Sequence, residues 1–294
     1  IFVTGATGYI GSAAVKDMLA AGHHVLGLAR SEQSEASLRA LGAEPLRGAL
    51  SDHASLRRAA EQSDAIAHLA FSQDLTKLVE SGREEADAIE LMGEVFAGSD
   101  RAFVTTSGCG FIADGKLLTE DIERPENEGL FRVSEQVTKG LLTKGVKAMI
   151  VRIPQVNGPH NSGFVALLIK IAREKGYAAY VGSGENRWPA AHVDDAGAIY
   201  RLAIERGQAG GIYHAVAEEA LRMRDLVALI AEKLGVPIRS IKPEEADAYF
   251  GPFAMFAQMD CPVSSVRTRA ELGWNPTGPT TFTDLREGDY FDQA

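Results

Sequence analysis

The chain opens with the stretch that decides its fold, Ile1-Phe2-Val3-Thr4-Gly5-Ala6-Thr7-Gly8-Tyr9-Ile10-Gly11. An apolar, β-prone run breaks into three glycines spaced three residues apart, and a helix-forming run follows. Gly5 can take a tight turn that a side chain would forbid. Gly8 has no Cβ to keep a pyrophosphate away from backbone amides, and Gly11 lets the following helix pack against the first strand. Because the helix would begin with free N–H donors and a partial positive charge, the stretch predicts a dinucleotide-binding turn.

Short apolar segments alternate with helical patterns through the first half of the chain. We expect strands at 1–4, 24–29, 44–48, 64–69, 101–106 and 147–153. Short strands separated by helices pair in parallel through right-handed crossovers, which predicts a doubly wound α/β sheet.

Beyond Pro154 the pattern changes. Residues 211–214 read as a strand that rejoins the main sheet, and amphipathic helices are expected at 164–174, 195–205 and 222–234. Turns rich in Pro and Gly indicate a smaller C-terminal substrate lobe. The expected division is a core at 1–154, rejoined by about 190–215, and a lobe made of 155–189 and 216–294.

Composition excludes several classes of partner. The 294 residues are 45% hydrophobic and 24% charged, as in a globular protein, and a net charge of -10 disfavours nucleic acid. We see no apolar run of the roughly 20 residues that cross a bilayer, so no membrane partner is expected, and no secretory signal. Cys109 and Cys261 have neither metal-ligand nor disulfide-framework spacing, so we expect no metal and a cytoplasmic protein.

The glycine stretch resembles the extended short-chain dehydrogenase/reductase superfamily of NAD-dependent epimerases and dehydratases. Five more landmarks of that superfamily follow in the right order, at 64–70, 103–107, 151–159, 188–195 and 269–276. The resemblance covers nearly the whole chain and implies a Rossmann-type sheet, an NAD(P) cofactor, a small-molecule substrate and a homodimer. It does not name a reaction.

Cofactor choice follows from the end of the second expected strand, Leu28-Ala29-Arg30-Ser31, which has no carboxylate before Glu32. NAD-preferring sites place Asp or Glu here to bind the ribose 2′-hydroxyl. Arg30 can instead pair with a 2′-phosphate, and Ser31 can donate a further hydrogen bond. NADP is therefore favoured over NAD, with a solvated surface arginine as the alternative interpretation of Arg30.

Other cofactor contacts follow from the resemblance. Leu50 would touch the adenine, although Ala49 replaces the usual aspartate beside it, and the segment 69–71 would line the ribose and nicotinamide. Leu50 and Leu69 can equally be core leucines. The complete set of expected cofactor residues is Gly5, Thr7, Gly8, Tyr9, Ile10, Gly11, Arg30, Ser31, Leu50, Leu69, Ala70, Phe71 and Pro154.

The catalytic residues depart from the superfamily, which uses a Ser or Thr after the fifth strand and a Tyr-x-x-x-Lys pair on the next helix. Ser107 occupies the serine position. With Ser134 as the register mark, Phe131 takes the tyrosine position and Glu135 the lysine position. Phenylalanine has no proton to transfer, and a glutamate would raise the pKa of a neighbouring phenol. The chain therefore resembles the atypical members that lack the pair.

Three functions remain open: an NADP-dependent reductase whose proton donor is another residue or water, a nucleotide-sugar epimerase or dehydratase with displaced catalytic groups, and an NADP(H)-binding sensor without turnover. Hydride transfer needs chiefly proximity and orientation, so reduction ranks first. Ser107 is then expected to orient the reacting oxygen.

Further polar residues each have a structural alternative. Cys109 is expected to be packed rather than nucleophilic, His160 to be solvated, and His192 to hold the lobe through hydrogen bonds. Arg132 and Arg187 can bind an anionic substrate or lie at the surface. An apolar cluster is interpreted as packing or a lobe interface; it consists of Phe250, Phe253, Met255, Phe256 and Met259.

Overall fold

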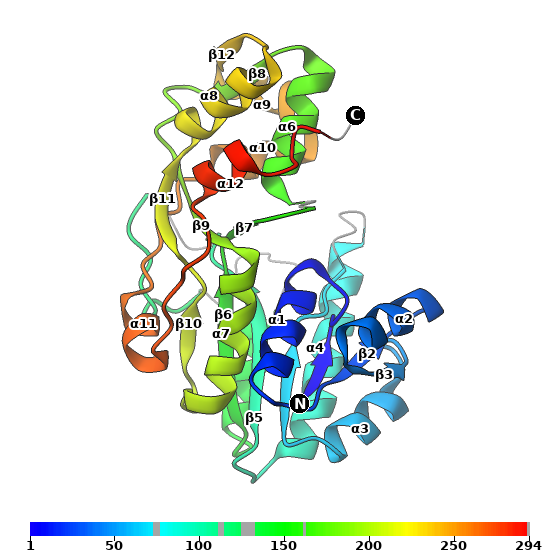
Figure 1. Cartoon of the computed structure of the whole chain (residues 1–294). Coiled ribbons are helices and arrows are strands. Elements are labelled where there is room, and N and C mark those ends of the chain that lie inside the picture. Colours follow the sequence, from blue (N-terminus) through cyan, green and yellow to red (C-terminus); the bar gives the residue numbers. More distant parts are fainter. Residues whose placement is uncertain (73–76, 111–114, 125–132, 161–162, 293–294) are drawn as a thin grey trace.

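A computed structural model of the chain describes residues 1–72, 77–110, 115–124, 133–160 and 163–292. Its main sheet has seven parallel strands in the order β10-β6-β5-β4-β1-β2-β3 (Figure 1). Their bounds are β1 Phe2–Thr4, β2 Leu26–Ala29, β3 Glu44–Arg47, β4 Ala65–His68, β5 Ala102–Gly108, β6 Lys147–Ile153 and β10 Ile212–His214. The six expected strands and the rejoining strand are confirmed, with ends that differ by up to two residues.

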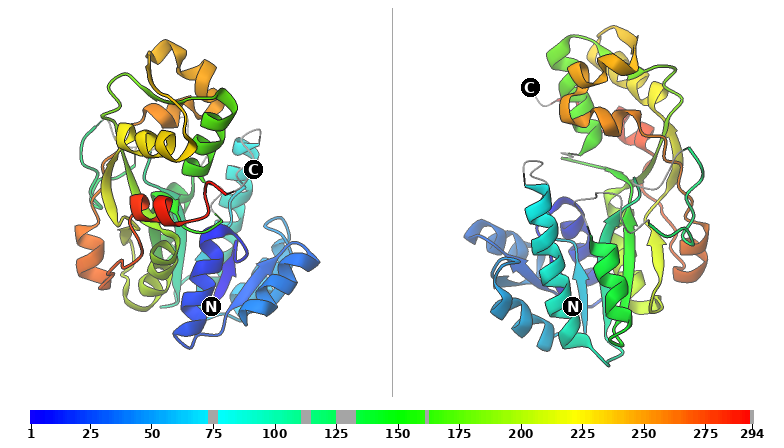
Figure 2. Two further views of the ribbon diagram at one scale, coloured as in Figure 1. Left: turned by 45° about the horizontal axis from the view of Figure 1, so that its top comes forward. Right: turned by 180° about the vertical axis from the view of Figure 1, so that it is seen from behind.

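Helices cover both faces of this sheet because successive side chains of each strand point to opposite sides. In β1, Phe2 packs into one core cluster and Val3 into the other. One face carries α1 Tyr9–Ala20, α2 Glu32–Leu41 and α7 Val193–Arg206. The other carries α3 His53–Glu61, α4 Leu78–Phe96 and α5 Ser134–Leu142, the last two in front in the right-hand view of Figure 2. Burial on both faces explains why the strands read as continuous apolar runs.

The C-terminal lobe has its own core above the main sheet (Figure 1). Two parallel strands and a set of helices form it: β8 Ala178–Val181, β12 Ile238–Ile241, α6 Phe164–Lys175, α8 Met223–Leu234, α9 Ala246–Phe250, α10 Ala254–Gln258, α12 Thr281–Glu287 and the 3-10 turns η1 Pro243–Glu245 and η2 Gly251–Phe253. A three-stranded sheet of β7 Gln155–Asn157, β9 Arg187–His192 and β11 Glu218–Arg222 joins the lobe to the main sheet. The expected helices at 164–174, 195–205 and 222–234 are confirmed as α6, α7 and α8.

One segment that was expected in the lobe lies on the main sheet instead. Helix α11, Val266–Leu272, packs on α7 and β10, and Trp274 after it belongs to the main-sheet core. The Trp274 indole donates a hydrogen bond to the Asp195 carbonyl at 3.1 Å. The chain thus returns to the main sheet before α12 re-enters the lobe, and the exact division into two domains stays a prediction.

Among the helices of the described residues, none is both long and apolar enough to cross a membrane.

Candidate functional site

The expected cofactor residues meet at one edge of the main sheet. Because all seven strands pair in parallel, their carboxyl ends share this edge. Strands β1 and β4 are neighbours there, and the chain order reverses between them, which is where open α/β sheets bind their ligands. Gly5, Arg30 and Leu69 directly follow β1, β2 and β4, and Pro154 directly follows β6. The structure therefore brings these residues together, while their contact with a cofactor stays a prediction.

The glycine loop has the backbone that its sequence requires. Gly5 has a φ of 68°, and a Cβ there would lie 2.7 Å from the Ala70 amide nitrogen. A Cβ at Gly11 would collide with the Gly5 carbonyl oxygen. Among the described residues other than its chain neighbours, a Cβ at Gly8 would meet one atom within 4 Å, the Gly5 oxygen at 3.1 Å. Gly5 and Gly11 are therefore needed for packing, whereas Gly8 keeps space open in front of the loop.

Helix α1 presents its first turn to that space. Gly8 is its N-cap in an extended conformation, no side chain caps it, and its first turn holds no acidic residue. The first N–H groups of a helix lack partners within the helix, and they attract anions. Together with the space in front of Gly8, this amide end fits the pyrophosphate of a dinucleotide.

The adenosine-ribose end of the expected site carries two arginines. Arg30 and Ser31 are exposed, and Ser31 caps α2 by accepting a hydrogen bond from the Ser34 amide at 3.1 Å. Ala29, the residue before Arg30, is the register partner of Arg47 on β3, so the backbones of the two arginines lie close together. Arg47 pairs with Glu35 at 3.2 Å. The sequence pattern gave no role to Arg47, whose place follows only from strand pairing.

Leu50 and Leu69 are half-buried and pack against the two cores of the main sheet. The interpretation of both residues as core leucines therefore agrees with the structure. Ala70 and Phe71 are also half-buried, and the Ala70 amide donates to the Thr4 hydroxyl at 3.3 Å. These segments support the loop after β1 from the side of β4.

Ser107 is completely buried near the end of β5. The Arg124 guanidinium donates a hydrogen bond to its hydroxyl oxygen, with Nη1 and Oγ 3.2 Å apart. The Glu135 carboxylate is close enough that Ser107 helps to lower its pKa. Phe131 and Arg132 lie outside the described residues. The Ser107 hydroxyl thus lies close to a cation and an anion of the protein itself.

Glu135, near the start of α5, forms a buried two-point ion pair with Arg152 of β6. Nε and Oε1 are 3.0 Å apart, and Nη2 and Oε2 are 2.9 Å apart. Burial alone would raise the pKa of Glu135, but hydrogen bonds and charge from Arg152, with smaller help from Ser107 and Arg124, place that pKa below its ordinary value. Glu135 is therefore an ionised carboxylate and a weak base. A lysine at this position would face Arg152, so the superfamily's pair does not fit here without a second change.

The polar network continues from Arg152 to the edge strand β10. Arg152 Nη1 donates to the Ile122 carbonyl at 3.0 Å and lies 3.3 Å from Nε2 of His214. The other ring nitrogen of His214 lies 2.8 Å from the Ser264 carbonyl oxygen. Burial, the largest cause, lowers the pKa of His214 to about 4, and the Arg152 charge adds to the lowering. A neutral ring that donates from Nδ1 and accepts at Nε2 satisfies both contacts.

This arrangement limits the chemistry at Ser107. Within the described part of the chain, its polar neighbours are two guanidinium groups and an ionised carboxylate, none of which releases a proton easily at neutral pH. A tyrosine does approach β5, because the Tyr200 hydroxyl lies 2.8 Å from Thr106 Oγ1. Tyr200 is fully buried on the α7 side of the sheet, which makes it a packing residue.

The surroundings of Cys109 and His160 agree with the expectations from the sequence, whereas those of His192 differ. Burial raises the pKa of the Cys109 thiol, which packs with Cys261 in a small apolar cluster. His160 is 85% exposed and pairs with Asp289 at 3.0 Å. His192 caps α7 by accepting from the Asp194 amide at 3.3 Å. Its visible hydrogen bond therefore stabilises a helix end and does not bridge to the lobe.

Arg187, a candidate for binding an anionic substrate, is already paired. Its Nε and Nη2 contact the two carboxylate oxygens of Asp260 at 2.8 and 2.9 Å, and Nη2 also donates to the Gly115 carbonyl at 2.8 Å. The side chain is 35% exposed. The sequence offered no signal for Asp260, which lies 73 positions away.

The C-terminal segment touches the same edge of the sheet. The Tyr290 hydroxyl accepts a hydrogen bond from the Gly158 amide at 2.6 Å and donates to Asp284. A Cβ at Gly158 would lie 2.8 Å from the Tyr9 hydroxyl oxygen, so this turn rests against the glycine loop. Tyr290 was not identified from the sequence.

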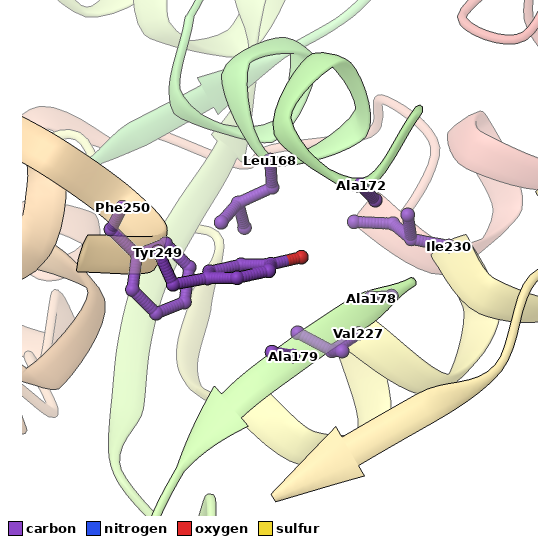
Figure 3. Close-up of a pocket in the computed structure, with 8 residues that line it drawn as sticks. All are labelled: Leu168, Ala172, Ala178, Ala179, Val227, Ile230, Tyr249 and Phe250. Atoms are coloured by element: carbon purple, nitrogen blue, oxygen red, sulfur yellow. The ribbon is translucent and has the colours of Figure 1, made fainter. Parts of the chain in front are cut away.

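A cavity of about 10 Å³ lies inside the lobe core (Figure 3). Its lining is Leu168, Ala172, Ala178, Ala179, Val227, Ile230, Tyr249 and Phe250. The polar atom among these side chains, the Tyr249 hydroxyl, donates to the Tyr177 carbonyl at 2.6 Å. With room for about one water and no convergent polar groups, the cavity is a packing gap. No cluster of three or more metal-ligand side chains occurs in the described residues.

Comparison with known proteins agrees with this geometry. Residues 1–121 and 131–216 match the model of the NAD dependent epimerase/dehydratase family. An uncharacterised protein of Schizosaccharomyces pombe is 42% identical over 99% of both chains. An uncharacterised protein of Saccharomyces cerevisiae is 37% identical over 97% of both. A sterol-4-alpha-carboxylate 3-dehydrogenase of Dictyostelium discoideum is 26% identical over 80% of this chain and 76% of its own.

Among solved structures, a dTDP-glucose 4,6-dehydratase from Streptomyces venezuelae with bound NAD superposes with a TM-score of 0.75. It is 20% identical, and the match covers 97% of this chain and 96% of the other. At that identity the likeness shows a shared fold.

Proposed function

Because this chain belongs to the NAD dependent epimerase/dehydratase family, we propose that it is an NADP-dependent reductase of a small carbonyl substrate. The family implies NAD(P) binding, and relatives at 26% identity are named as dehydrogenases and reductases. The preference for NADP, the direction of the reaction and the substrate are the parts that we propose.

The observation that carries the choice of reduction is the charge around Ser107. Epimerases and dehydratases of this type begin by oxidising a hydroxyl, which requires a base to take its proton. The carboxylate at hand, Glu135, has a lowered pKa and is tied to Arg152. Reduction has the opposite need, because negative charge develops on the carbonyl oxygen. The Arg124 guanidinium beside Ser107 favours that charge.

Bound NADPH would supply the hydride, which becomes the new C–H bond at the carbonyl carbon. The oxygen keeps the electron pair of the broken π bond and takes one proton from solvent. The protein's part is to hold the cofactor at the amide end of α1, place the carbonyl near Ser107 and stabilise its developing charge. A positioned proton donor typically adds roughly 10²–10⁴ in rate, so turnover should be slow for this superfamily.

The preference for NADP rests on Arg30. It is exposed at the end of β2, next to the position of Arg47, and both guanidinium groups favour a phosphate over a hydroxyl. We expect Arg30→Ala to weaken NADPH binding by about 1.5–3 kcal/mol while leaving NADH binding nearly unchanged. Arg39→Ala, on the last turn of α2, is the matched control.

Titration calorimetry with both reduced cofactors measures this, followed by a turnover panel of aldehydes, ketones and nucleotide sugars. Equal affinity of the parent protein for NADPH and NADH would refute the NADP assignment. Conversion of nucleotide sugars alone would favour the epimerase or dehydratase alternative. Tight NADPH binding without turnover of any compound would favour the sensor.

A further inference from the structure

We propose that the non-reacting part of the substrate is an uncharged, apolar chain that lies on an aromatic wall of the lobe, and that the site does not take a nucleoside diphosphate. The wall consists of Phe164, Trp188, Phe253, Phe256 and Met259. The inference rests on the proposed function, because it names a substrate class for the same site.

The wall is centred on Phe164, the first residue of α6. Its ring centroid lies 4.9 Å from that of Phe253, 5.0 Å from Phe256 and 5.7 Å from Trp188. Phe164 is nevertheless 38% exposed, and Phe256 and Met259 are half-buried, whereas Trp188 and Phe253 are buried and support them from the lobe core. Figure 1 shows α6 beginning at the end of the lobe that faces the main sheet. An aromatic surface in this position is suited to an apolar ligand group.

The wall is continuous with the loop that carries Ser107. A Cβ at Gly110, three positions after Ser107, would lie 3.1 Å from the Met259 sulfur. The Met259 amide donates to the Phe256 carbonyl at 3.1 Å, which ties this methionine to the aromatic rings. A chain attached to a carbonyl at Ser107 therefore meets Met259 first and the rings beyond it.

Phe164 also follows the turn at Gly158 by six positions in the chain, and Gly158 rests against the Tyr9 hydroxyl of α1.

Charge decides between an apolar chain and a diphosphate. Asp260, next to Met259 in the chain, holds Arg187 through two side-chain contacts and one to the Arg187 backbone amide at 2.9 Å. The hydrogen bond from Arg187 is the largest influence on the pKa of the Asp260 carboxyl and keeps it below its ordinary value, so Asp260 stays ionised. A diphosphate here would meet a carboxylate and would have to displace it from Arg187. An uncharged chain meets no such cost.

The test is equilibrium binding of methyl ketones of increasing alkyl length to the NADP-loaded full chain, measured by calorimetry. We expect Kd to fall about threefold to fourfold for each added methylene, the usual gain for burying one such group. UDP-glucose should produce no binding heat. Phe164→Ala and Phe256→Ala should weaken the dependence of ketone affinity on alkyl length, whereas Phe164→Leu should keep most of it. Ile238→Ala is the control, because Ile238 is a 45% exposed residue of β12 in the same lobe, and this variant should leave the dependence unchanged.

Asp260→Asn tests the charge argument separately, because it releases Arg187 and should create measurable UDP-glucose binding. The inference is overturned if the parent binds UDP-glucose or if ketone affinity does not depend on chain length. Because these readouts are binding constants, they separate the two proposals. A length dependence without turnover supports the apolar wall and refutes the reductase, whereas turnover of short carbonyls without length dependence does the reverse.

Discussion

Two segments at the same edge of the sheet, the loop after β1 and the end of β5, differ in which groups they present. After β1, the glycine loop offers backbone groups to the outside, and a Cβ at Gly8 would meet one protein atom within 4 Å. At the end of β5, Ser107 is completely buried, and its hydroxyl accepts a hydrogen bond from Arg124 close to the Glu135 carboxylate. The first segment is built around a space for a ligand, and the second around charged side chains of the protein itself.

The difference predicts that cofactor binding and proton transfer are separable in this fold. The glycine loop depends on backbone geometry and tolerates few residue types. The polar site after β5 depends on side chains, so an ion pair can replace its acid and base without disturbing the sheet. Four predictions test this contrast.

The largest effect is expected from breaking the buried ion pair. Arg152→Met leaves Glu135 charged and buried without its partner, which should lower the free energy of unfolding by about 3–5 kcal/mol. Urea unfolding monitored by circular dichroism measures it. The double variant Glu135→Leu, Arg152→Met should recover most of the loss. A single variant as stable as the parent would show that the pair is not part of the core.

Acid should expose the same network through His214. Its pKa is lowered from 6.5 to about 4 by burial, so the folded protein resists a proton that the unfolded chain accepts. The neutral His214 ring therefore contributes fully to the free energy of unfolding above about pH 6.5. This contribution, about 3 kcal/mol, is lost as the pH falls toward about 4. The free energy of unfolding should be measured across that pH range. Its dependence on pH should become weaker in His214→Asn but not in His53→Asn, which replaces an exposed histidine of α3. An unchanged slope in His214→Asn would contradict this.

The glycine loop should respond in binding while its fold persists. Gly8→Val fills the space in front of the α1 amides, so NADPH affinity should fall about a hundredfold, or about 2.7 kcal/mol. Calorimetry measures the affinity, and melting curves confirm folding. Gly140→Ala is the control, since a Cβ there would meet no atom within 4 Å among the described residues outside its own stretch of helix. Unchanged affinity in folded Gly8→Val would make the loop an ordinary turn.

The smallest effect on stability is expected at Ser107. Ser107→Ala removes one hydroxyl from a network that keeps its ion pair, which should cost about 1 kcal/mol. If Ser107 orients the reacting oxygen, turnover should fall while NADPH affinity stays the same. A variant with full turnover would remove Ser107 from the mechanism and leave Arg124 as the group beside the carbonyl.

Much of the fold could be predicted because its signals are local. Strand positions, the helices α6, α7 and α8 and the strand at 211–214 follow from apolar periodicity and from turn residues. The short strands of the lobe and α11 were missed, since their pairing partners are distant in the chain. The Leu-Gly-Trp segment at 272–274 carried a family landmark, yet nothing local shows that it packs on α7.

The sequence by itself determined the glycine loop, because Gly5, Gly8 and Gly11 act through the absence of a side chain, and that absence can be read directly. It also predicts that Phe131 and Glu135 stand where the superfamily has its Tyr and Lys. Only the tertiary structure decided what replaces that pair. Charge is long-ranged and depends on burial, so the partnership of Glu135 with Arg152, of Ser107 with Arg124 and of Arg187 with Asp260 exists only after β5, β6 and the lobe have come together.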